Sequence, residues 1–292
     1  MKGKLRTDLH LHTTMSDGLR TPEETVNEAL RTNMDVIAIT DHDAVDGIGP
    51  AQRAAAGTSL TVVPGVELNL EFPRELHMLG LFIDPDCAAL KERLALLEEQ
   101  RKVRAQRTVE KLRDLGIPIT LDDVFLKAKG KSVGRGHIAH ALTEMGAAKD
   151  QDDAFAKYLA IGRPAYVPNE RMKPKEGIRL IHEAGGVAVW AHPVQTFGDE
   201  IRMRTLYEKL KEYGLDGLEC VHPSCTPAQM RILLNWCTQD GLLATGGSDW
   251  HAREGNRPIG WSSEYYEIER AIPGAAEKIA RGERFLNRKE SS

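Results

Sequence analysis

TDLHLHTTMSDG, residues 7–18, is the stretch around which this 292-residue chain is best understood. Its leucines alternate with polar residues, and this alternation predicts a short strand. Side chains two residues apart on a strand share a face, so His10 and His12 are expected to point the same way and to hold one metal ion. Asp17 follows in a turn. A lone His-x-His pair can also be two unrelated polar residues at a strand end. The choice between this alternative and a metal site depends on the rest of the chain.

Strand and helix patterns alternate after this stretch. Thr21-Pro22-Glu23-Glu24 has the sequence of a capping box with proline at the first helical position, so it predicts a helix start. Apolar runs of the kind that buried parallel strands show recur along the chain. This alternation favours a parallel barrel or a doubly wound sheet. The further predicted strands cover residues 35–43, 60–67, 76–82, 187–191, 215–219 and 242–245.

The alternation stops in the middle of the chain. One long charged helix is predicted from Cys87 to about Leu115, with shorter helices after it. We therefore predict a barrel domain made of residues 1–84 and 171–292, and a helical insert at 85–170. Residues 91–175 carry 18 Lys/Arg against 12 Asp/Glu, whereas the whole chain has a net charge of −4. A basic segment beside an acidic scaffold suits an anionic substrate, although a solvated helical surface would show the same balance.

Composition and termini indicate a protein of the cytoplasm. The chain is 41% hydrophobic and 28% charged, which is ordinary for a globular protein. No apolar run approaches the ~18 residues of a membrane span, and the first ten residues lack the apolar core of a signal peptide. The four cysteines show no C-x-x-C spacing, so we expect free thiols, a cytoplasmic location and no membrane partner.

Potential metal ligands stand at the ends of the predicted strands. In β/α barrels the active site lies at the C-terminal face and is assembled from several strand ends, which favours the barrel over the doubly wound sheet. Individually, His77 could be a hydrogen-bonded core histidine, Asp249 could cap a turn, and Asp41 and Asp43 could be loop carboxylates. Jointly the set predicts a metal site. The predicted ligands are His10, His12, Asp17, His42, Glu67, His77, His192, Asp249 and His251.

The ligand types narrow the choice of metal. Imidazole mixed with carboxylate suits Mn²⁺, Fe²⁺ or Zn²⁺ better than a thiolate-type site or Ca²⁺. Nine candidate ligands are too many for one ion, so two or three divalent ions are expected, with Mn²⁺ preferred.

These motifs resemble those of the PHP family, named for polymerase and histidinol phosphatase. The resemblance implies an α/β fold, a distorted (β/α)7 barrel with a trinuclear metal cluster. It also implies a partition of the ligands among three ions: His10, His12, Glu67 and Asp249 for the first, Glu67, His77 and His251 for the second, and Asp17, His42 and His192 for the third. The matching pieces are His10-x-His12, Thr40-Asp41-His42, Gly65-x-Glu67, Ala191-His192-Pro193 and Ser248-Asp249-x-His251.

Two stretches of the insert, residues 131–139 and 162–167, resemble a branch of this family that removes phosphate from nucleotides. In that branch the insert is a lid over the barrel mouth, which places Arg135 and His137 at the substrate phosphate. A planar guanidinium pairs bidentately with phosphate oxygens, although Arg135 could also be a surface helix residue. Further substrate contacts are predicted at Lys131, Ser132 and Arg163, and Arg171 and Lys173 are candidates for the same role.

The sequence therefore predicts a monomeric, metal-dependent nucleotide phosphoesterase. The resemblance to this branch implies that its substrates are 3',5'-bisphosphonucleotides such as 3'-phosphoadenosine 5'-phosphate, which would lose the 3'-phosphate, and short 5'-phosphorylated RNA. Low aromatic content argues against long nucleic acid strands. Two alternatives share the metal motifs: a histidinol-phosphate phosphatase and a non-catalytic accessory module. The residues predicted to take part in catalysis are His192, Asp249 and His222.

Overall fold

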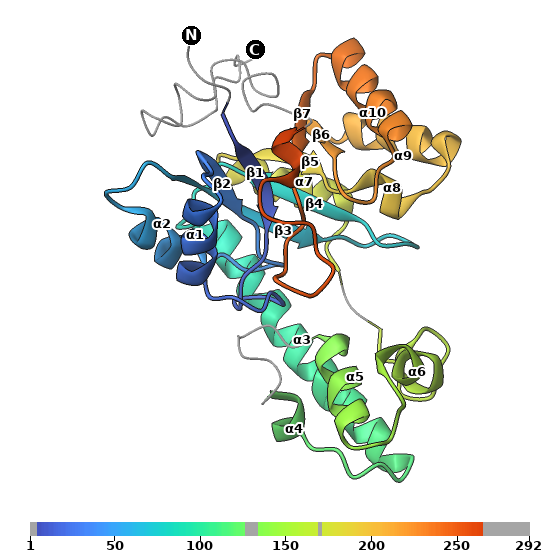
Figure 1. Ribbon diagram of the computed structural model, residues 1–292. Helices are drawn as coiled ribbons and strands as arrows, with labels where there is room; N and C mark the ends of the chain where they lie inside the picture. Colours follow the sequence, from blue (N-terminus) through green and yellow to red (C-terminus); the bar gives the residue numbers. More distant parts are fainter. Residues whose placement is uncertain (1–4, 126–133, 169–170, 265–292) are drawn as a thin grey trace. The chain divides into compact units, whose positions relative to one another are not determined.

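Residues 5–125, 134–168 and 171–264 of the chain are described by a computed structural model (Figure 1). The described strands are β1 (Thr7–Leu11), β2 (Val36–Ile39), β3 (Thr61–Asn69), β4 (His77–Leu81), β5 (Val187–Trp190), β6 (Gly217–Val221) and β7 (Leu243–Gly246). They form one sheet in the order of the chain. The sheet nearly closes, because His12 donates a backbone hydrogen bond to the carbonyl oxygen of Trp250, beyond β7, at 3.0 Å. The predicted distorted seven-stranded barrel is confirmed.

One strand runs against the others. β4 pairs antiparallel with β3 and with β5, whereas the remaining neighbours pair in parallel. In this register His77 lies opposite Asn69, the last residue of β3. Because β4 is reversed, its first residue lies at the edge where its neighbours end. His77 therefore reaches the same face of the barrel as the residues that follow β3 and β5.

Helices connect the strands and pack on the sheet. The capping box predicted at Thr21 is present: its hydroxyl accepts a hydrogen bond from the Glu24 N–H at 3.2 Å, and the Glu24 carboxylate accepts one from the Thr21 N–H at 2.9 Å. The helices of the barrel are α1 (Pro22–Arg31), α2 (Ile48–Ala55), α7 (Pro174–Glu183), α8 (Pro193–Thr196), α9 (Glu200–Glu212) and α10 (Pro227–Asp240), with a 3-10 turn, η2 (Trp261–Glu264). Of these, α2 packs on β3, α7 on β4 and β5, and α10 on β6 and β7.

The described residues fall into two compact units. One comprises the described residues of the segments 1–91 and 172–292 and holds the barrel, and the other comprises those of the segment 92–171. The chain enters the second unit inside a continuous helix, α3 (Ala88–Asp114), rather than at the boundary after residue 84 that the sequence predicts. A helix that runs through a domain boundary gives no Gly or Pro signal there, which explains the shift.

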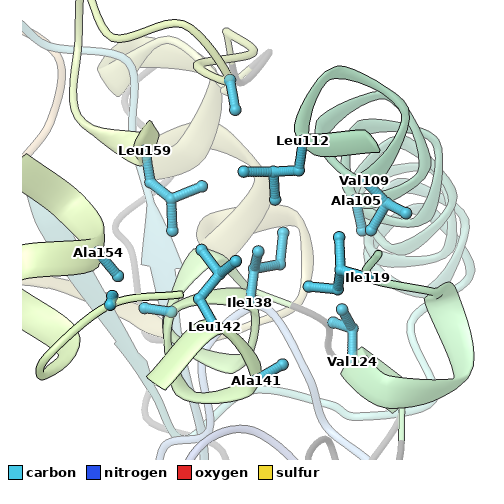
Figure 2. Packing of buried hydrophobic residues seen from close by; sticks show 13 residues of the cluster. Ala105, Val109, Leu112, Ile119, Val124, Ile138, Ala141, Leu142, Ala154 and Leu159 are labelled. Carbon is cyan, nitrogen blue, oxygen red and sulfur yellow. The ribbon is translucent and has the colours of Figure 1, made fainter. Parts of the chain in front are cut away.

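The second unit has a hydrophobic core of its own. Besides α3, it contains α4 (Leu121–Phe125), α5 (Arg135–Glu144), α6 (Gln151–Ala154) and a π-helical turn, η1 (Phe155–Leu159). Figure 2 shows how Leu112 of α3 and Leu159 of η1 meet Ile138 and Leu142 of α5. These four side chains are at most 1% exposed. A buried cluster of this kind is what an independently packed domain requires.

The helix α3 is long but highly charged. Its 27 residues would be enough to cross a bilayer, yet lysine, arginine and glutamate are spread along it. Within the described ranges, no helix combines the length and the apolar character that a membrane span needs.

Candidate metal centre

The carboxylate of Glu67, on β3, lies at the centre of a cluster of imidazole rings. It is completely buried, and each of its oxygens faces several ring nitrogens. One carboxylate is therefore in contact with five of the predicted ligands at once. Its Oε1 lies 2.9 Å from both His77 Nδ1 and His192 Nε2, and its Oε2 lies 3.3 Å from His10 Nε2, 3.2 Å from His12 Nε2 and 3.0 Å from His42 Nδ1.

The strand β1 supplies one side of the cluster. His10 and His12 share a face, as the alternation predicts, and their Nε2 atoms lie 3.5 and 3.2 Å from Asp249 Oδ1. Asp249 follows β7, and it reaches β1 because the barrel closes there. The ligand atoms of His10, His12 and Glu67 all lie within 4.8 Å of one another, which is close enough for one ion.

A second group forms beside it. The ligand atoms of His12, Asp17, His42 and His251 also lie within 4.8 Å of one another. Asp17 Oδ1 is 3.1 Å from His251 Nε2 and 3.8 Å from His12 Nδ1. The rings of His12 and His251 stack with their centroids 4.1 Å apart. The predicted turn residue Asp17 is thus part of the cluster.

A third group differs from the partition that the resemblance implies. It comprises His42, Glu67 and His77, and His192 Nε2 lies 3.3 Å from His77 Nδ1. In this geometry His192 lies with Glu67 and His77, whereas His251 lies with Asp17. The partition implied by the resemblance has the reverse, with His251 beside Glu67 and His77 and His192 beside Asp17. The reason is topological: reversed β4 pairs with β5, which leads to His192, and the segment after β7 lies against β1.

The donor atoms of the cluster fit divalent metal ions. Folded proteins rarely leave buried polar atoms without a hydrogen bond, because each such atom costs free energy. Imidazole nitrogens and carboxylate oxygens grouped in this way are ligands for Zn²⁺, Mn²⁺ or Fe²⁺. The buried side-chain atoms of the site without a hydrogen-bond partner in the described part of the chain are His10 Nε2, His12 Nε2, Asp17 Oδ1, Glu67 Oε2, His77 Nε2, His192 Nδ1 and His222 Nε2.

The charged groups of this cluster shift the pKa values of their neighbours. Burial alone would raise the pKa of Glu67, but the surrounding histidines hold it well below its usual range. Burial alone would lower the pKa of His12, but the carboxylates of Asp249 and Glu67, each 3.2 Å from its Nε2, raise it to about 10. The pKa of His10 is likewise raised well above its ordinary value, against the effect of burial, by Glu219 and Glu67. Both shifts favour the positively charged imidazolium form of these two histidines when no metal is bound.

Metal binding is therefore expected to release protons and to strengthen with rising pH. Because the pKa values of His10 and His12 are raised, a metal ion must displace protons from these rings at pH 6. The free energy needed to remove those protons falls as the pH rises. Mn²⁺ affinity should increase by at least ~10-fold between pH 6 and pH 8. Isothermal titration at pH 7 in two buffers of different ionisation enthalpy measures the released protons. An affinity that is independent of pH would contradict this prediction.

Two carboxylates near the cluster form hydrogen bonds within the loops rather than facing the candidate ligand atoms. Asp41 accepts hydrogen bonds from the Thr13 N–H and hydroxyl, both at 2.7 Å, and from the Ser16 hydroxyl at 2.6 Å. It braces the loop that carries Asp17. Asp43 accepts two hydrogen bonds from Asn69, both at 2.9 Å. The geometry favours the loop-carboxylate alternative for both residues.

The strand β6 contributes two residues to the site. Glu219 was predicted only as the end of a strand, yet its carboxylate is completely buried and lies 3.0 Å from His10 Nδ1. Burial would raise its pKa, but His10 and other histidines lower it. His222 follows β6, and its Nε2 lies 3.4 Å from Asp249 Oδ2. The signal for Glu219 was an acidic residue inside an otherwise apolar strand.

The predicted substrate residues of the insert are only partly described. Arg135, the first residue of α5, lies with its guanidinium 5.6 Å from the centre of the Phe155 ring and 6.0 Å from that of Tyr166. Its side chain is half-buried, and its Nη1 donates a hydrogen bond to the Leu159 carbonyl oxygen at 3.4 Å. His137 Nδ1 accepts a hydrogen bond from the Gly134 N–H at 3.1 Å, and Arg163 is exposed. Lys131 and Ser132 lie outside the described residues.

Further arginines gather near Arg135. Burial lowers the pKa of Arg104, on α3, to about 10, and neighbouring positive charges contribute. These charges belong to Arg135, Arg101 and Arg171. Arg101 lies one turn from Arg104 on α3 and is only 8% exposed. The insert therefore holds a concentration of guanidinium groups, two of which, Arg101 and Arg104, the sequence analysis did not single out.

Comparison of the sequence with known proteins gives consistent matches. The PHP domain family matches residues 8–116. The 5'-3' exoribonuclease Rnm of Escherichia coli (strain K12) is 37% identical over 247 residues, which is 84% of each chain. The 3',5'-nucleoside bisphosphate phosphatase of Chromobacterium violaceum is 34% identical over 272 residues, covering 91% of this chain and 94% of that protein.

Solved structures agree with the sequence matches. An amidohydrolase from Chromobacterium violaceum with bound sulfate and no metal superimposes with a TM-score of 0.77 at 31% identity, covering 87% of this chain and 90% of that one. A protein from Bifidobacterium adolescentis described as a metal-dependent phosphoesterase gives 0.73 at 30% identity, with 91% and 96% covered. With this barrel, this cluster and relatives of 34–37% identity over most of its length, the chain belongs to the PHP domain family.

Proposed function

We propose that this chain is a metal-dependent phosphoesterase that hydrolyses phosphate monoesters of nucleotides. The preferred reaction is removal of the 3'-phosphate from 3',5'-bisphosphonucleotides such as 3'-phosphoadenosine 5'-phosphate, with short 5'-phosphorylated oligoribonucleotides as further substrates. The observation that carries the proposal is that Glu67 and the eight other predicted ligands gather at one face of the barrel. Relatives that act on bisphosphonucleotides and on RNA support the substrate class.

The proposed cofactor is a cluster of two or three divalent ions, Mn²⁺ before Fe²⁺ or Zn²⁺. Three overlapping groups of ligand atoms support more than one ion. A site that combines imidazole and carboxylate donors suits all three metals. Bound ions would lower the pKa of a water molecule and polarise the phosphoryl group for attack.

His222 is the proposed proton donor to the leaving oxygen. The Ser224 N–H donates a hydrogen bond to His222 Nδ1 at 3.1 Å, so the proton of the neutral ring sits on Nε2. That Nε2 lies 3.4 Å from Asp249 Oδ2, at the edge of the cluster. His192 is better suited to hold metal, because its Nε2 already contacts Glu67 at 2.9 Å. Asp249, shared between His222 and β1, would orient the donor.

The insert is the proposed source of contacts to phosphate groups that do not react. Arg135 is held between aromatic rings near Arg101 and Arg104, which supports binding of a polyanion. A guanidinium can pair with phosphate through two parallel hydrogen bonds. The predicted contacts at Lys131, Ser132, His137 and Arg163 remain part of this proposal, as does the role of the insert as a lid.

Replacing Arg135 by alanine should weaken substrate binding and leave the metal centre intact. Losing a charge-assisted phosphate contact is expected to raise KM for the bisphosphonucleotide ~10–100-fold. Arg107→Ala is the matched control, because Arg107 is an exposed arginine of α3 in the same unit. Steady-state kinetics and metal analysis of both variants check the prediction. Loss of metal from Arg135→Ala would count against the assignment.

The function is tested on four substrates with added Mn²⁺, by measuring released inorganic phosphate for the monoesters and released phosphate or nucleotide for the RNA. The substrates are 3'-phosphoadenosine 5'-phosphate, 5'-AMP, a short 5'-phosphorylated RNA and histidinol phosphate. The proposal expects the bisphosphate or the RNA to be preferred, and product analysis identifies the bond that breaks. A preference for histidinol phosphate would overturn the nucleotide assignment. Inactivity of metal-loaded protein on all four would favour the accessory module.

A further inference from the structure

Glu219 is a buried carboxylate whose two oxygens are both engaged. It lies on β6, is 0% exposed, and its neighbours along the strand are apolar. Its Oε1 lies 3.0 Å from His10 Nδ1, and its Oε2 accepts a hydrogen bond from the His192 backbone N–H at 2.8 Å. A buried carboxylate is costly unless such partners are present. Glu219 therefore joins β1, β5 and β6 at the metal end of the barrel.

The contact with His10 determines which ring nitrogen can bind metal. An ionised carboxylate only accepts hydrogen bonds, so His10 Nδ1 must carry the proton. The lone pair of the neutral ring is then on Nε2, which points at Glu67 Oε2, 3.3 Å away. That Nε2 has no hydrogen-bond partner among the described residues. Glu219 thus selects the tautomer in which His10 presents a ligand atom to the cluster.

The contact with His192 fixes a strained turn. His192 has a φ of 30°, a left-handed conformation that residues other than glycine adopt only when their surroundings hold them. The hydrogen bond from its N–H to Glu219 restrains this backbone directly. This backbone conformation places the His192 ring so that its Nε2 lies 2.9 Å from Glu67 Oε1. One carboxylate therefore orients two predicted ligands on different strands.

Close packing leaves this carboxylate little room to move. A Cβ atom added at Gly247, just beyond β7, would lie 2.3 Å from His10 Cβ and 2.8 Å from Glu219 Oε1. Gly247 therefore lets the end of β7 pass directly over the pair. The backbone at Gly247 packs directly against His10 and Glu219, and a residue with a side chain would not fit there.

We propose that Glu219 is a positioning residue of the metal centre. It binds no ion itself, because both oxygens are committed to His10 and His192, and it holds these two ligands in the tautomer and orientation that binding requires. Partners of metal-bound histidines commonly act in this way. This inference rests on the proposed metal centre but not on any substrate.

The test replaces Glu219 by glutamine, which keeps the shape of the side chain. The amide can no longer accept from both partners, and its NH₂ group can drive the His10 proton onto Nε2. Mn²⁺ affinity measured by titration calorimetry should fall ~10–100-fold. In Zn²⁺-loaded protein, ¹⁵N-histidine NMR should lose the signal of a His10 ring protonated at Nδ1.

Asp216→Asn is the matched control. Asp216 precedes β6 and has the same chemistry at the opposite end of that strand: its Oδ2 lies 2.7 Å from His182 Nε2 and accepts from the Ala188 N–H at 2.8 Å. Its replacement should leave metal affinity unchanged even where it lowers the Tm. If Glu219→Gln does not fold, Glu219→Asp, whose shorter side chain cannot span both partners, should still reduce metal affinity.

The outcomes separate this inference from the proposed function. Wild-type metal affinity in a folded Glu219→Gln protein would overturn the positioning role, as would an equal loss in Asp216→Asn. Failure of the wild-type chain to bind Mn²⁺ would overturn both the role and the metal centre. Loss of affinity in Glu219→Gln supports the role even if the wild-type chain proves inactive on every nucleotide, a result that would overturn the proposed function alone.

Discussion

Glu67→Gln is expected to remove most bound metal and to lower kcat/KM by at least ~10³-fold. Glu67 contacts five histidines within 3.3 Å, and its negative charge raises the pKa of three of them, His10, His12 and His42. Glutamine keeps the shape but loses the charge, and its NH₂ group would face ring nitrogens that need lone-pair access to metal. The three ligand groups overlap at or near Glu67, so the loss should affect more than one ion.

Metal analysis after loading with Mn²⁺ and gel filtration is the direct measurement. Glu183→Gln provides a control, because Glu183 is an exposed residue of α7 that pairs with Arg179 at 3.0 Å. Its metal content and activity should match those of the wild-type chain. A Glu67→Gln protein with a full complement of metal would show that Glu67 is a neighbour of the centre rather than its shared ligand.

The sequence was sufficient where a pattern is local. Alternation with leucines placed His10 and His12 on one face of β1, and the capping box marked the start of α1. Both features depend only on residues a few positions apart. The alternation of strands and helices limited the fold to a parallel barrel or a doubly wound sheet, and the candidate ligands at the strand ends favoured the barrel.

The sequence was insufficient where an element's direction or inner face matters. The apolar run 76–82 fits a strand of either direction, so it could not show that β4 is reversed and that His77 begins it at the metal face. The same reversal brings His192 to His77, which the implied partition missed. Glu219 presents a related problem, because a strand buried on both faces does not show which way each side chain points.

The arginines of the insert illustrate non-local packing. Along α3, Arg101 and Arg104 look like any charged helix surface in the sequence. Their burial and their neighbours Arg135 and Arg171 depend on how α3 packs with α5 and the segment after it. Helical periodicity identifies neighbours within one helix but not the partner helix. For this reason the guanidinium cluster became visible only in the structure.

His222→Ala is expected to lower kcat by ~10²–10⁴-fold while metal content stays at the wild-type level. The 3'-oxygen of a nucleotide is a poor leaving group, so it needs a proton as the phosphoester bond breaks. His222 offers that proton on Nε2, because the Ser224 N–H occupies Nδ1 at 3.1 Å. Ser224→Ala is the matched control: it removes the hydroxyl, 2.8 Å from Nδ1, but keeps the backbone N–H that sets the tautomer.

The leaving group distinguishes a proton donor from a structural residue. An aryl phosphate such as p-nitrophenyl phosphate releases an anion that is stable without protonation. The defect of His222→Ala should therefore shrink by at least ~10-fold on that substrate. An equal defect on both substrates, or loss of metal through the 3.4 Å contact with Asp249, would show instead that His222 acts by holding the cluster together. Because this comparison uses one variant and two leaving groups, the folding of the variant cancels from the ratio.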